Sequence, residues 1–182
     1  MKLETKRLVL RDIKKSDAES IQRNINNIKV SQYLLVVPFP YAKSDAEWWV
    51  NHCEEKQREN PRTSYELGIV IKPGKEVVGG AGLSQVNFTE GSAHIGYWLA
   101  EEYWRQGYVS EAAKRLIEFA FEDLGLDKII IPVFAENEGS NALAKKVGGV
   151  FVGRKEKAAT AKSTGKVHDE NFYEVTKESF RK

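Results

Sequence analysis

The amino-acid sequence predicts one mixed α/β domain of the α+β kind, with a central sheet of about seven strands flanked by about four helices. Its 182 residues suffice for one compact domain and are few for two. Nothing repeats at a fixed period and no stretch has linker composition, so residues 1–182 are expected to form a single domain. The predicted order is strand, helix, helix, three strands, helix, strand, helix and two strands, which is typical of helices packed on a central sheet.

The first predicted elements are a strand and two helices. Residues 7–11 alternate between charged and apolar side chains and are expected to form an edge-type strand. Residues 16–19 and 44–47 each have the Ser-x-x-Glu spacing of a capping box, in which each side chain bonds the backbone N–H of the other residue. The two boxes therefore predict two helices, the first running toward residue 28.

After Pro61 the pattern changes to strands that later alternate with helices. Pro73-Gly74-Lys75 is a turn signal, because proline presets φ and glycine tolerates positive φ. Apolar residues at helical spacing from Val109 to Leu124 give the strongest helix signal in the chain, and Gly125 ends it. The apolar run at residues 128–134 is typical of a buried central strand. Further strands are predicted at residues 65–71, 76–83, 93–99, 150–155 and 171–176, and a further helix at 139–147.

Composition and charge narrow the class of protein. Hydrophobic residues make up 41% of the chain and charged residues 30%, which is ordinary for a globular protein and excludes a disordered one. The 28 Lys and Arg nearly balance the 26 Asp and Glu, which argues against nucleic-acid binding through overall charge. The longest apolar stretches are far shorter than a membrane span, and Cys53 is the single cysteine. We therefore expect a cytoplasmic protein with no membrane and no direct nucleic-acid partner.

One strand-to-helix turn is a candidate anion site. A strand ends at Leu99, a short polar loop follows, and a long amphipathic helix begins near Val109. Gly107 lets the loop turn tightly and present backbone N–H groups, and the helix start adds unpaired N–H donors and the positive end of its dipole. These donors suit a phosphate or pyrophosphate, with Arg105 and Ser110 as further contacts. The alternative is a plain turn in which Ser110 only caps the helix.

The same segment resembles a known family. Ile95-Gly96-Tyr97-Trp98-Leu99, followed by Tyr103-Trp104-Arg105-Gln106-Gly107-Tyr108-Val109-Ser110-Glu111-Ala112, is similar to the acetyl-CoA motif of the GNAT acetyltransferases. The similarity is closest to the RimJ/RimL-like branch, whose members acetylate protein N-termini and other amines. It covers nearly the whole chain and includes Leu3-Glu4-Thr5-Lys6-Arg7-Leu8, Gly79-Gly80-Ala81-Gly82 and Asn137-Glu138-Gly139-Ser140-Asn141. Three positions depart from the superfamily pattern: Trp104 stands in place of Gln or Arg, a change familiar in this branch, Arg105 stands where glycine is usual, and Val109 replaces a small residue.

The resemblance implies the GNAT fold, in which a mixed, mostly antiparallel sheet contains a splayed strand pair that receives acetyl-CoA. It implies that the strand end pairs with the pantetheine arm and that the turn holds the pyrophosphate. Ser140 is expected to be catalytic and to face the sulfur, where a hydroxyl can protonate the leaving thiolate. Without the resemblance, Asn137 is a helix cap and Ser140 a solvated hydroxyl. The predicted cofactor-binding residues are Tyr97, Trp98, Leu99, Arg105, Gln106, Gly107, Tyr108, Val109, Ser110 and Asn137.

The predicted function is direct transfer of an acetyl group from acetyl-CoA to a primary amine, because no residue is placed to form a covalent intermediate. The favoured acceptor is a protein or peptide N-terminal amine, such as that of a ribosomal protein. Two alternatives stand beside it, an acetyltransferase of a polyamine, amino acid or antibiotic, and a non-catalytic acyl-CoA-binding sensor. No metal is expected, because the histidines at 52, 94 and 168 lack metal-ligand spacing. The protein is expected to be a monomer or a homodimer.

The general base and the acceptor groove are less defined by the sequence. The loop at 34–41, stiffened by Pro38 and Pro40, and the hairpin at 155–168 are expected to form the walls of the groove. Lysines at 155, 157, 162 and 166 near these walls disfavour a polycation as acceptor. Candidates for the base, none of them at a decisive spacing, are Glu136, Glu156, His94, His168 and Asp169.

Overall fold

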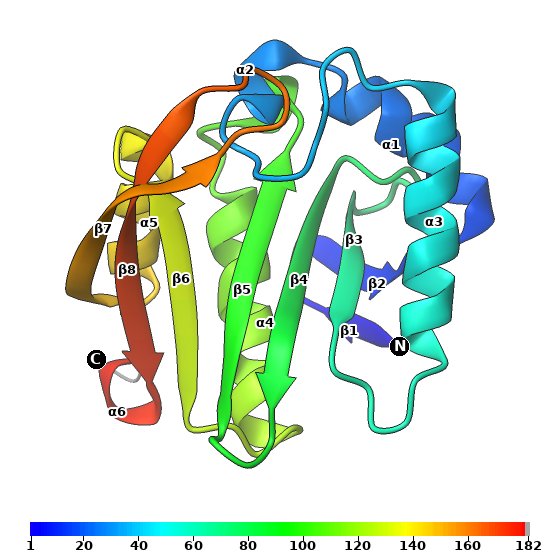
Figure 1. Ribbon diagram of the computed structural model, residues 1–182. Helices are drawn as coiled ribbons and strands as arrows, with labels where there is room; N and C mark the ends of the chain where they lie inside the picture. The colour runs from blue at the N-terminus through cyan, green and yellow to red at the C-terminus, as the bar shows by residue number, and fades with distance from the viewer. Residues whose placement is uncertain (181–182) are drawn as a thin grey trace.

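The computed structural model describes residues 1–180, and within them the strands form one eight-stranded sheet (Figure 1). The strand order is β1-β2-β3-β4-β5-β6-β8-β7. Every neighbouring pair is antiparallel except β5 and β6, which confirms the predicted mixed, mostly antiparallel sheet. The strands are β1 (Lys2–Glu4), β2 (Leu8–Asp12), β3 (Tyr65–Ile71), β4 (Gly79–Asn87), β5 (Ser92–Leu99), β6 (Lys128–Phe134), β7 (Val150–Thr160) and β8 (Val167–Thr176).

The parallel strands β5 and β6 are paired at one end and diverge at the other. Register partners join residues 92–94 of β5 to residues 128–130 of β6. From Ile95 to Leu99 the register partners of β5 lie in β4, while β6 continues to Phe134 along β8. The splayed pair implied by the resemblance is therefore present, and one backbone edge of β5 is left without a strand partner among residues 1–180.

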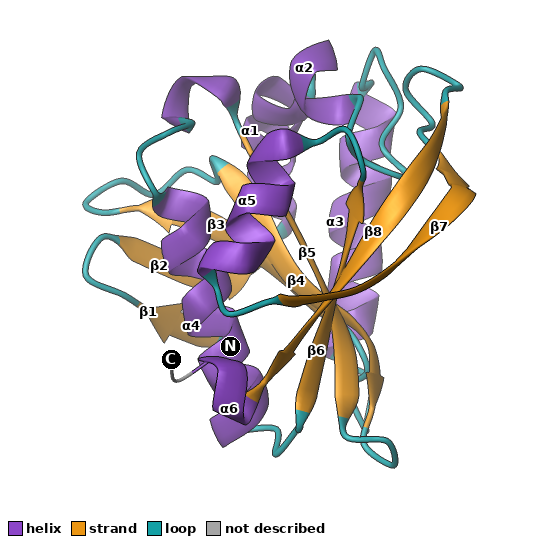
Figure 2. Ribbon diagram, turned by 90° about the vertical axis from the view of Figure 1, so that its left-hand side faces the viewer, coloured by secondary structure: helices purple, strands orange, loops and turns teal. Residues whose placement is uncertain are grey.

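Helices cover both faces of the sheet. Figure 2 shows α4 and α5 on one face and α3 on the other. The large buried cluster includes Leu116 and Ile117 of α4, and a smaller cluster includes Ile21 and Val50 of α1 and α3. No helix among residues 1–180 is both long enough and apolar enough to cross a membrane. The helices are α1 (Ala18–Ile25), α2 (Ile28–Ser31), α3 (Lys43–Gln57), α4 (Tyr108–Glu122), α5 (Glu138–Lys146) and α6 (Lys177–Phe180).

The element predictions fail mainly near the N-terminus. The short strand β1 was not predicted, and because β2 pairs with both β1 and β3, residues 8–12 form an interior strand and not an edge strand. The helix expected to run toward residue 28 ends at Ile25, and Asn27 caps the separate helix α2. The sequence predicted about seven strands and about four helices. With β1, α2 and the short α6 added, residues 1–180 contain eight strands and six α-helices.

Both predicted capping boxes are shifted in register. The Lys14 N–H donates to Asp17 Oδ2 at 2.8 Å, and the Ala42 N–H donates to Asp45 Oδ2 at 2.8 Å. In each case the aspartate after the serine reaches back three residues, in place of the expected glutamate. The cause is an earlier helical turn, because a 3₁₀ helix (Lys15–Asp17) precedes α1 and α3 begins at Lys43.

Candidate functional site

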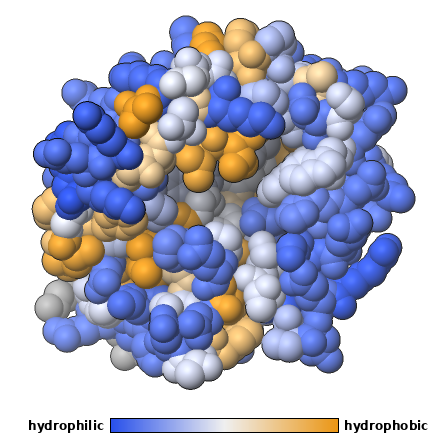
Figure 3. All heavy atoms as spheres, in the orientation of Figure 1, coloured by the Kyte–Doolittle hydropathy of each residue, from blue (hydrophilic) through white to orange (hydrophobic). Residues whose placement is uncertain are grey.

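A cleft of about 990 Å³ opens where β5 and β6 diverge. It is lined by the ends of both strands, the turn before α4, the first turns of α5, and residues 29–35 in and after α2. Figure 3 shows a hollow on this face of the molecule, with hydrophobic side chains gathered along its upper edge. The cleft brings together nearly all the predicted site residues, namely Tyr97, Trp98, Leu99, Arg105, Gly107, Tyr108, Val109, Ser110, Asn137 and Ser140.

Gln106 is the predicted site residue that does not line the cleft. Its side-chain amide donates to the Glu102 carbonyl at 3.1 Å, in the 3₁₀ helix (Glu101–Tyr103) that precedes the turn. Its own carbonyl accepts a hydrogen bond from Arg7 Nη1 at 3.0 Å. Gln106 therefore shapes the turn through its backbone, and its side chain packs on the preceding loop.

The turn before α4 has the geometry of an anion site. Arg105 and Gly107 both adopt the left-handed conformation, with φ of 61° and 80°. The backbone N–H groups from Arg105 to Ser110 donate to no protein acceptor within residues 1–180. Unpaired N–H groups at a helix start attract negative charge, so the turn fits a phosphate group. The left-handed Arg105 also explains why glycine would be favoured at this position.

The free end of β5 places two aromatic side chains on opposite faces of the sheet. Tyr97 packs against the cluster beneath α4, while Trp98 packs against the cluster of α1 and α3. The Trp98 indole lies over Gly80, where an added Cβ would come within 2.5 Å of Nε1. This close approach requires glycine at position 80. The end of β5 is held in turn by Trp104, whose indole N–H donates to the Leu99 carbonyl at 2.7 Å.

Asn137, Ser140 and Tyr97 form a hydrogen-bonded group at the start of α5. Asn137 Oδ1 accepts from the Ser140 backbone N–H at 3.1 Å, so Asn137 is the helix cap. The Ser140 hydroxyl lies 2.8 Å from the Tyr97 hydroxyl. Burial raises the pKa of Tyr97 to about 12, so the phenol keeps its proton and can donate it to Ser140. The Ser140 hydroxyl, which plays no part in the cap, is thus free to donate into the cleft.

Of the five expected base candidates, only Glu136 lines the cleft. Its carboxylate accepts from Lys166 Nζ and contacts His168 Nδ1, each at 2.8 Å, and the Lys166 bond holds its pKa down at about 2. A carboxylate of such low pKa is a weak base. Asp169 is ion-paired with Arg154. The remaining candidates, Glu156, His94 and His168, are outside the cleft lining.

Glu170 is the cleft carboxylate that sequence reasoning missed. Its neighbour Asn171 on β8 donates to Asn141 of α5 at 2.8 Å, and strand alternation therefore turns Glu170 to the opposite face of the sheet. Glu170 is half-buried, and no hydrogen bond or ion pair of its carboxylate is found within residues 1–180. Burial raises its pKa, an effect that Lys155 opposes. No sequence pattern marks it, because Glu170 reaches the cleft through the pairing of β8 with β6, which sets it opposite Phe134.

The loop after α2 borders the cleft. Tyr33, Leu34 and Leu35 line it. The hairpin of β7 and β8 braces this loop, because the Ser163 hydroxyl donates to the Ser31 carbonyl at 2.9 Å and the Lys162 N–H to the Leu35 carbonyl at 3.1 Å. Figure 1 shows the hairpin tip beside α2. Leu34 and Leu35 of the expected loop wall line the cleft, whereas no residue of the hairpin expected at 155–168 does. The hairpin supports the loop instead of forming a wall.

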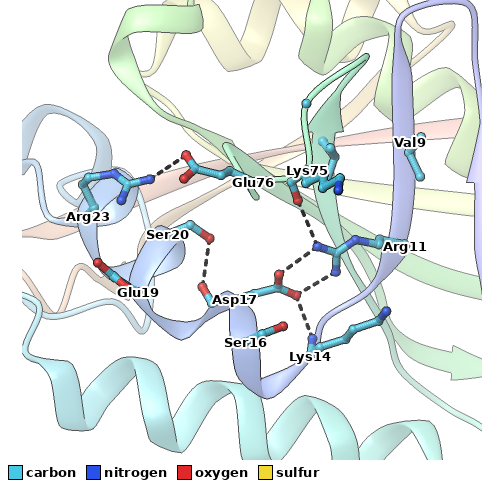
Figure 4. Close-up of a pocket in the computed structure, with 12 residues that line it drawn as sticks. Val9, Arg11, Lys14, Ser16, Asp17, Glu19, Ser20, Arg23, Lys75 and Glu76 are labelled. Atoms are coloured by element: carbon cyan, nitrogen blue, oxygen red, sulfur yellow. Dashed lines mark hydrogen bonds and ion pairs between the residues drawn. The ribbon is translucent and has the colours of Figure 1, made fainter.

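A second cavity of about 540 Å³ lies at the start of α1 and contains none of the predicted site residues. Figure 4 shows that its charged side chains bond one another. Both Arg11 Nη atoms donate to the Asp17 carboxylate at 2.7 Å, and Arg23 pairs with Glu76 at 2.7 Å. This cavity is a structural ion-pair cluster that joins β2 to α1.

Comparison with known proteins assigns the chain to a family. Residues 7–150 match the model of the acetyltransferase (GNAT) domain, so the chain belongs to the GNAT acetyltransferases. It is an acetyl-CoA-dependent N-acetyltransferase, as the family match and the named N-acetyltransferases among its relatives indicate. Among residues 1–180 no group of His, Cys, Asp and Glu is arranged to hold a metal ion.

Three relatives illustrate the range of the similarity. The uncharacterized N-acetyltransferase YoaA of Bacillus subtilis is 33% identical over 80% of this chain and 81% of its own. The spermidine N(1)-acetyltransferase of Escherichia coli is 23% identical over 76% of this chain and 70% of its own. The ribosomal-protein-S5-alanine acetyltransferase of Vibrio fischeri shares the fold, with a TM-score of 0.81 and 19% identity over 99% of this chain and 98% of its own.

Proposed function

We propose that transfer takes place in the cleft between β5 and β6 and that the acceptor is a protein or peptide N-terminal amine. The observation that carries this proposal is the content of one cleft: unbonded N–H groups at the turn, the free edge of β5, Ser140, and the half-buried Glu170. These features fit acetyl-CoA from its pyrophosphate to its thioester. All of them belong to one continuous sheet and its helices, which supports a single catalytic domain.

The charges in the cleft favour an acceptor with one ammonium group. Three glutamates line the cleft, but Glu136 is ion-paired with Lys166 and Glu138 is exposed in the first turn of α5. Glu170 is left as one half-buried carboxylate without a partner in the described chain. A polyamine carries two or more positive charges, each of which needs a counter-charge when desolvated. A peptide α-amine needs one.

Different residues of the cleft serve the two proton transfers, one at the attacking amine and one at the leaving thiolate. Bound acetyl-CoA supplies the thioester whose carbonyl carbon the neutral amine attacks. Glu170 accepts the proton that the acceptor ammonium must lose before attack. The Ser140 hydroxyl donates a proton to the departing thiolate, so the C–S bond breaks to give free CoA, and the Tyr97 hydroxyl can return a proton to Ser140. The amine nitrogen forms the amide bond and releases its second proton. This proton replaces the one that Tyr97 and Ser140 passed to the thiolate, so the products are the amide, free CoA and the proton taken up by Glu170.

A competition panel tests the acceptor class. Peptides that begin with Ser, Ala or Met are offered beside spermidine, lysine and an aminoglycoside, and release of free CoA is followed with mass analysis of the products. We expect the highest kcat/KM for a peptide α-amine. The spermidine N(1)-acetyltransferase relative makes a polyamine the second candidate. If spermidine gives the highest kcat/KM, the N-terminal acceptor is wrong and the general transferase assignment stands.

A further inference from the structure

The segment between β1 and β2 is fastened to the first turn of α4. Thr5 Oγ1 donates to Glu111 Oε1 at 2.5 Å, and the Arg7 backbone N–H donates to the same oxygen at 3.0 Å. Arg7 Nε donates to Glu111 Oε2 at 2.7 Å. The carboxylate of Glu111 thus fixes the Arg7 side chain as well as its backbone. Both residues belong to segments that the family resemblance singled out and that the transfer chemistry does not use.

From this anchor the Arg7 guanidinium reaches three consecutive residues of the turn. Nη1 donates to the Gln106 carbonyl at 3.0 Å, and the guanidinium carbon lies 4.5 Å from the centre of the Tyr108 ring. A Cβ built on Gly107 would lie 3.5 Å from Nη2. Arg7 is therefore the side chain that sets where this turn lies relative to β2.

The bond to Gln106 determines where the next N–H points. In a trans peptide the C=O of one residue and the N–H of the next point in opposite directions. Because the Gln106 carbonyl is turned toward Arg7, the Gly107 N–H is turned away from it. Gly107 lines the cleft, and its N–H has no protein acceptor among residues 1–180. A charged donor on the carbonyl also polarises the peptide and strengthens its N–H as a donor.

We propose that Arg7, held by Glu111, is a positioning residue for acetyl-CoA: it orients the Gln106–Gly107 peptide so that the Gly107 N–H meets the pyrophosphate. The inference rests on the proposed assignment of this turn to the pyrophosphate. The charge of Arg7 is matched by that of Glu111, so its contribution is orientation. The competing explanation is that Arg7 only fastens β2 to α4.

A truncated acyl donor separates the two explanations. S-acetylpantetheine carries the thioester and the pantetheine arm but no pyrophosphate, so a positioning role at the pyrophosphate cannot affect its use. For Arg7→Ala we expect the KM for acetyl-CoA to rise about 10-fold, the loss expected for one charge-assisted hydrogen bond, with kcat little changed. The kcat/KM for S-acetylpantetheine should stay at the wild-type value.

Two further variants keep the test sound if Arg7→Ala folds poorly. Glu111→Gln retains the shape of the carboxylate but weakens its hold on Arg7, and it should raise the KM for acetyl-CoA in the same direction. Lys72→Ala is the matched control, because Lys72 ties Glu4 and the Thr5 carbonyl of the same segment without contacting the turn. Lys72→Ala should leave kcat/KM unchanged for both acetyl-CoA and S-acetylpantetheine.

The possible results separate a failure of the positioning role of Arg7 from a failure of the proposed pyrophosphate site. If Arg7→Ala and Glu111→Gln lower kcat/KM equally for acetyl-CoA and S-acetylpantetheine, the contact is structural and the positioning role is wrong. If the wild-type protein itself uses the two donors equally well, the turn does not bind the pyrophosphate. That second result would overturn the assignment of the site and the inference with it.

Discussion

At the scale of single residues, the Ser140 hydroxyl is the group on which the proposed chemistry depends most. Asn137 caps α5 through the Ser140 backbone N–H, so removing the hydroxyl leaves the cap intact. We expect Ser140→Ala to lower kcat about 10- to 1,000-fold and to leave acetyl-CoA affinity nearly unchanged, as for the loss of a general acid. Steady-state kinetics and calorimetry check this. Tyr97→Phe, which keeps the ring and removes its bond to Ser140, should cause a smaller loss of kcat.

Glu170 gives the reaction an expected pH dependence. Burial raises the pKa of Glu170 above the ordinary 4.5, and Lys155 on β7 opposes this shift. Two other titratable groups lie near it in the fold: Glu136 follows the end of β6, and His168 stands two residues before Glu170 on β8. A base must be ionised to accept a proton, so kcat/KM should fall as the pH is lowered. The midpoint of this acid limb should lie above pH 4.5. Glu170→Gln should abolish that limb and lower kcat.

The same pKa direction predicts that Glu170→Gln does not destabilise the fold. A carboxyl whose folded pKa is raised costs stability when ionised, and this cost is present at neutral pH and disappears as the pH falls below the unfolded pKa. The thermal midpoint of Glu170→Gln at pH 7 should therefore match or exceed that of the wild type. Glu156→Gln, at an exposed position on β7, is the control. If the Glu170→Gln variant kept wild-type activity, Glu170 would not be the base.

At the scale of elements, we propose that the turn before α4 holds the pyrophosphate through its backbone N–H groups, so the test is to change its backbone conformation. Gly107 has φ of 80°, which a β-branched residue adopts only at a cost of about 1–2 kcal/mol. We expect Gly107→Val to abolish measurable binding of CoA by calorimetry while circular dichroism shows a folded protein. Arg105→Gly, at the other left-handed position, should keep or increase the affinity. Equal affinity in Gly107→Val and wild type would remove the turn from the site.

Elements whose patterns are local were predictable from sequence, and those that depend on partners were not. Residues 65–71 and 128–134 have the predicted strand bounds, because apolar runs between turn signals identify buried strands. β1 has three residues, too few to show a period, and it is a strand because β2 offers it an edge. The cap register failed for a related reason, since neighbouring Ser and Asp residues both suit a helix start.

At the scale of the whole molecule, the cleft is assembled from segments far apart in the chain. Its turn was identified because glycine, loop and helix start are adjacent in sequence, and Ser140 because the family motif includes it. Glu170 has no such local signal. It reaches the cleft because β8 pairs with β6 in a register that sets it opposite Phe134, and tertiary pairing of this kind is not written in any single segment.

A hydrogen bond holds the β7–β8 hairpin against the end of α2 and the loop that follows it. Ser163 Oγ donates to the Ser31 carbonyl at 2.9 Å, which ties the hairpin to the loop whose residues Tyr33, Leu34 and Leu35 line the cleft. Ser163→Ala removes this bond and should let Tyr33 and Leu35 move, because a loop with fewer bonds opens more readily.

We expect Ser163→Ala to raise the KM for the amine acceptor about threefold to tenfold, the loss of roughly one hydrogen bond of about 1 kcal/mol. The KM for acetyl-CoA should not change, because the lost bond joins Ser163 to Ser31 and includes no residue of the turn before α4. Two-substrate kinetics measures both constants, and hydrogen exchange at residues 33–35 reports the loop directly. Thr164→Ala is the control, since Thr164 Oγ1 accepts from Lys166 within the hairpin. Faster exchange with an unchanged acceptor KM would show that the loop moves without contacting the acceptor, and the loop would lose its assigned role.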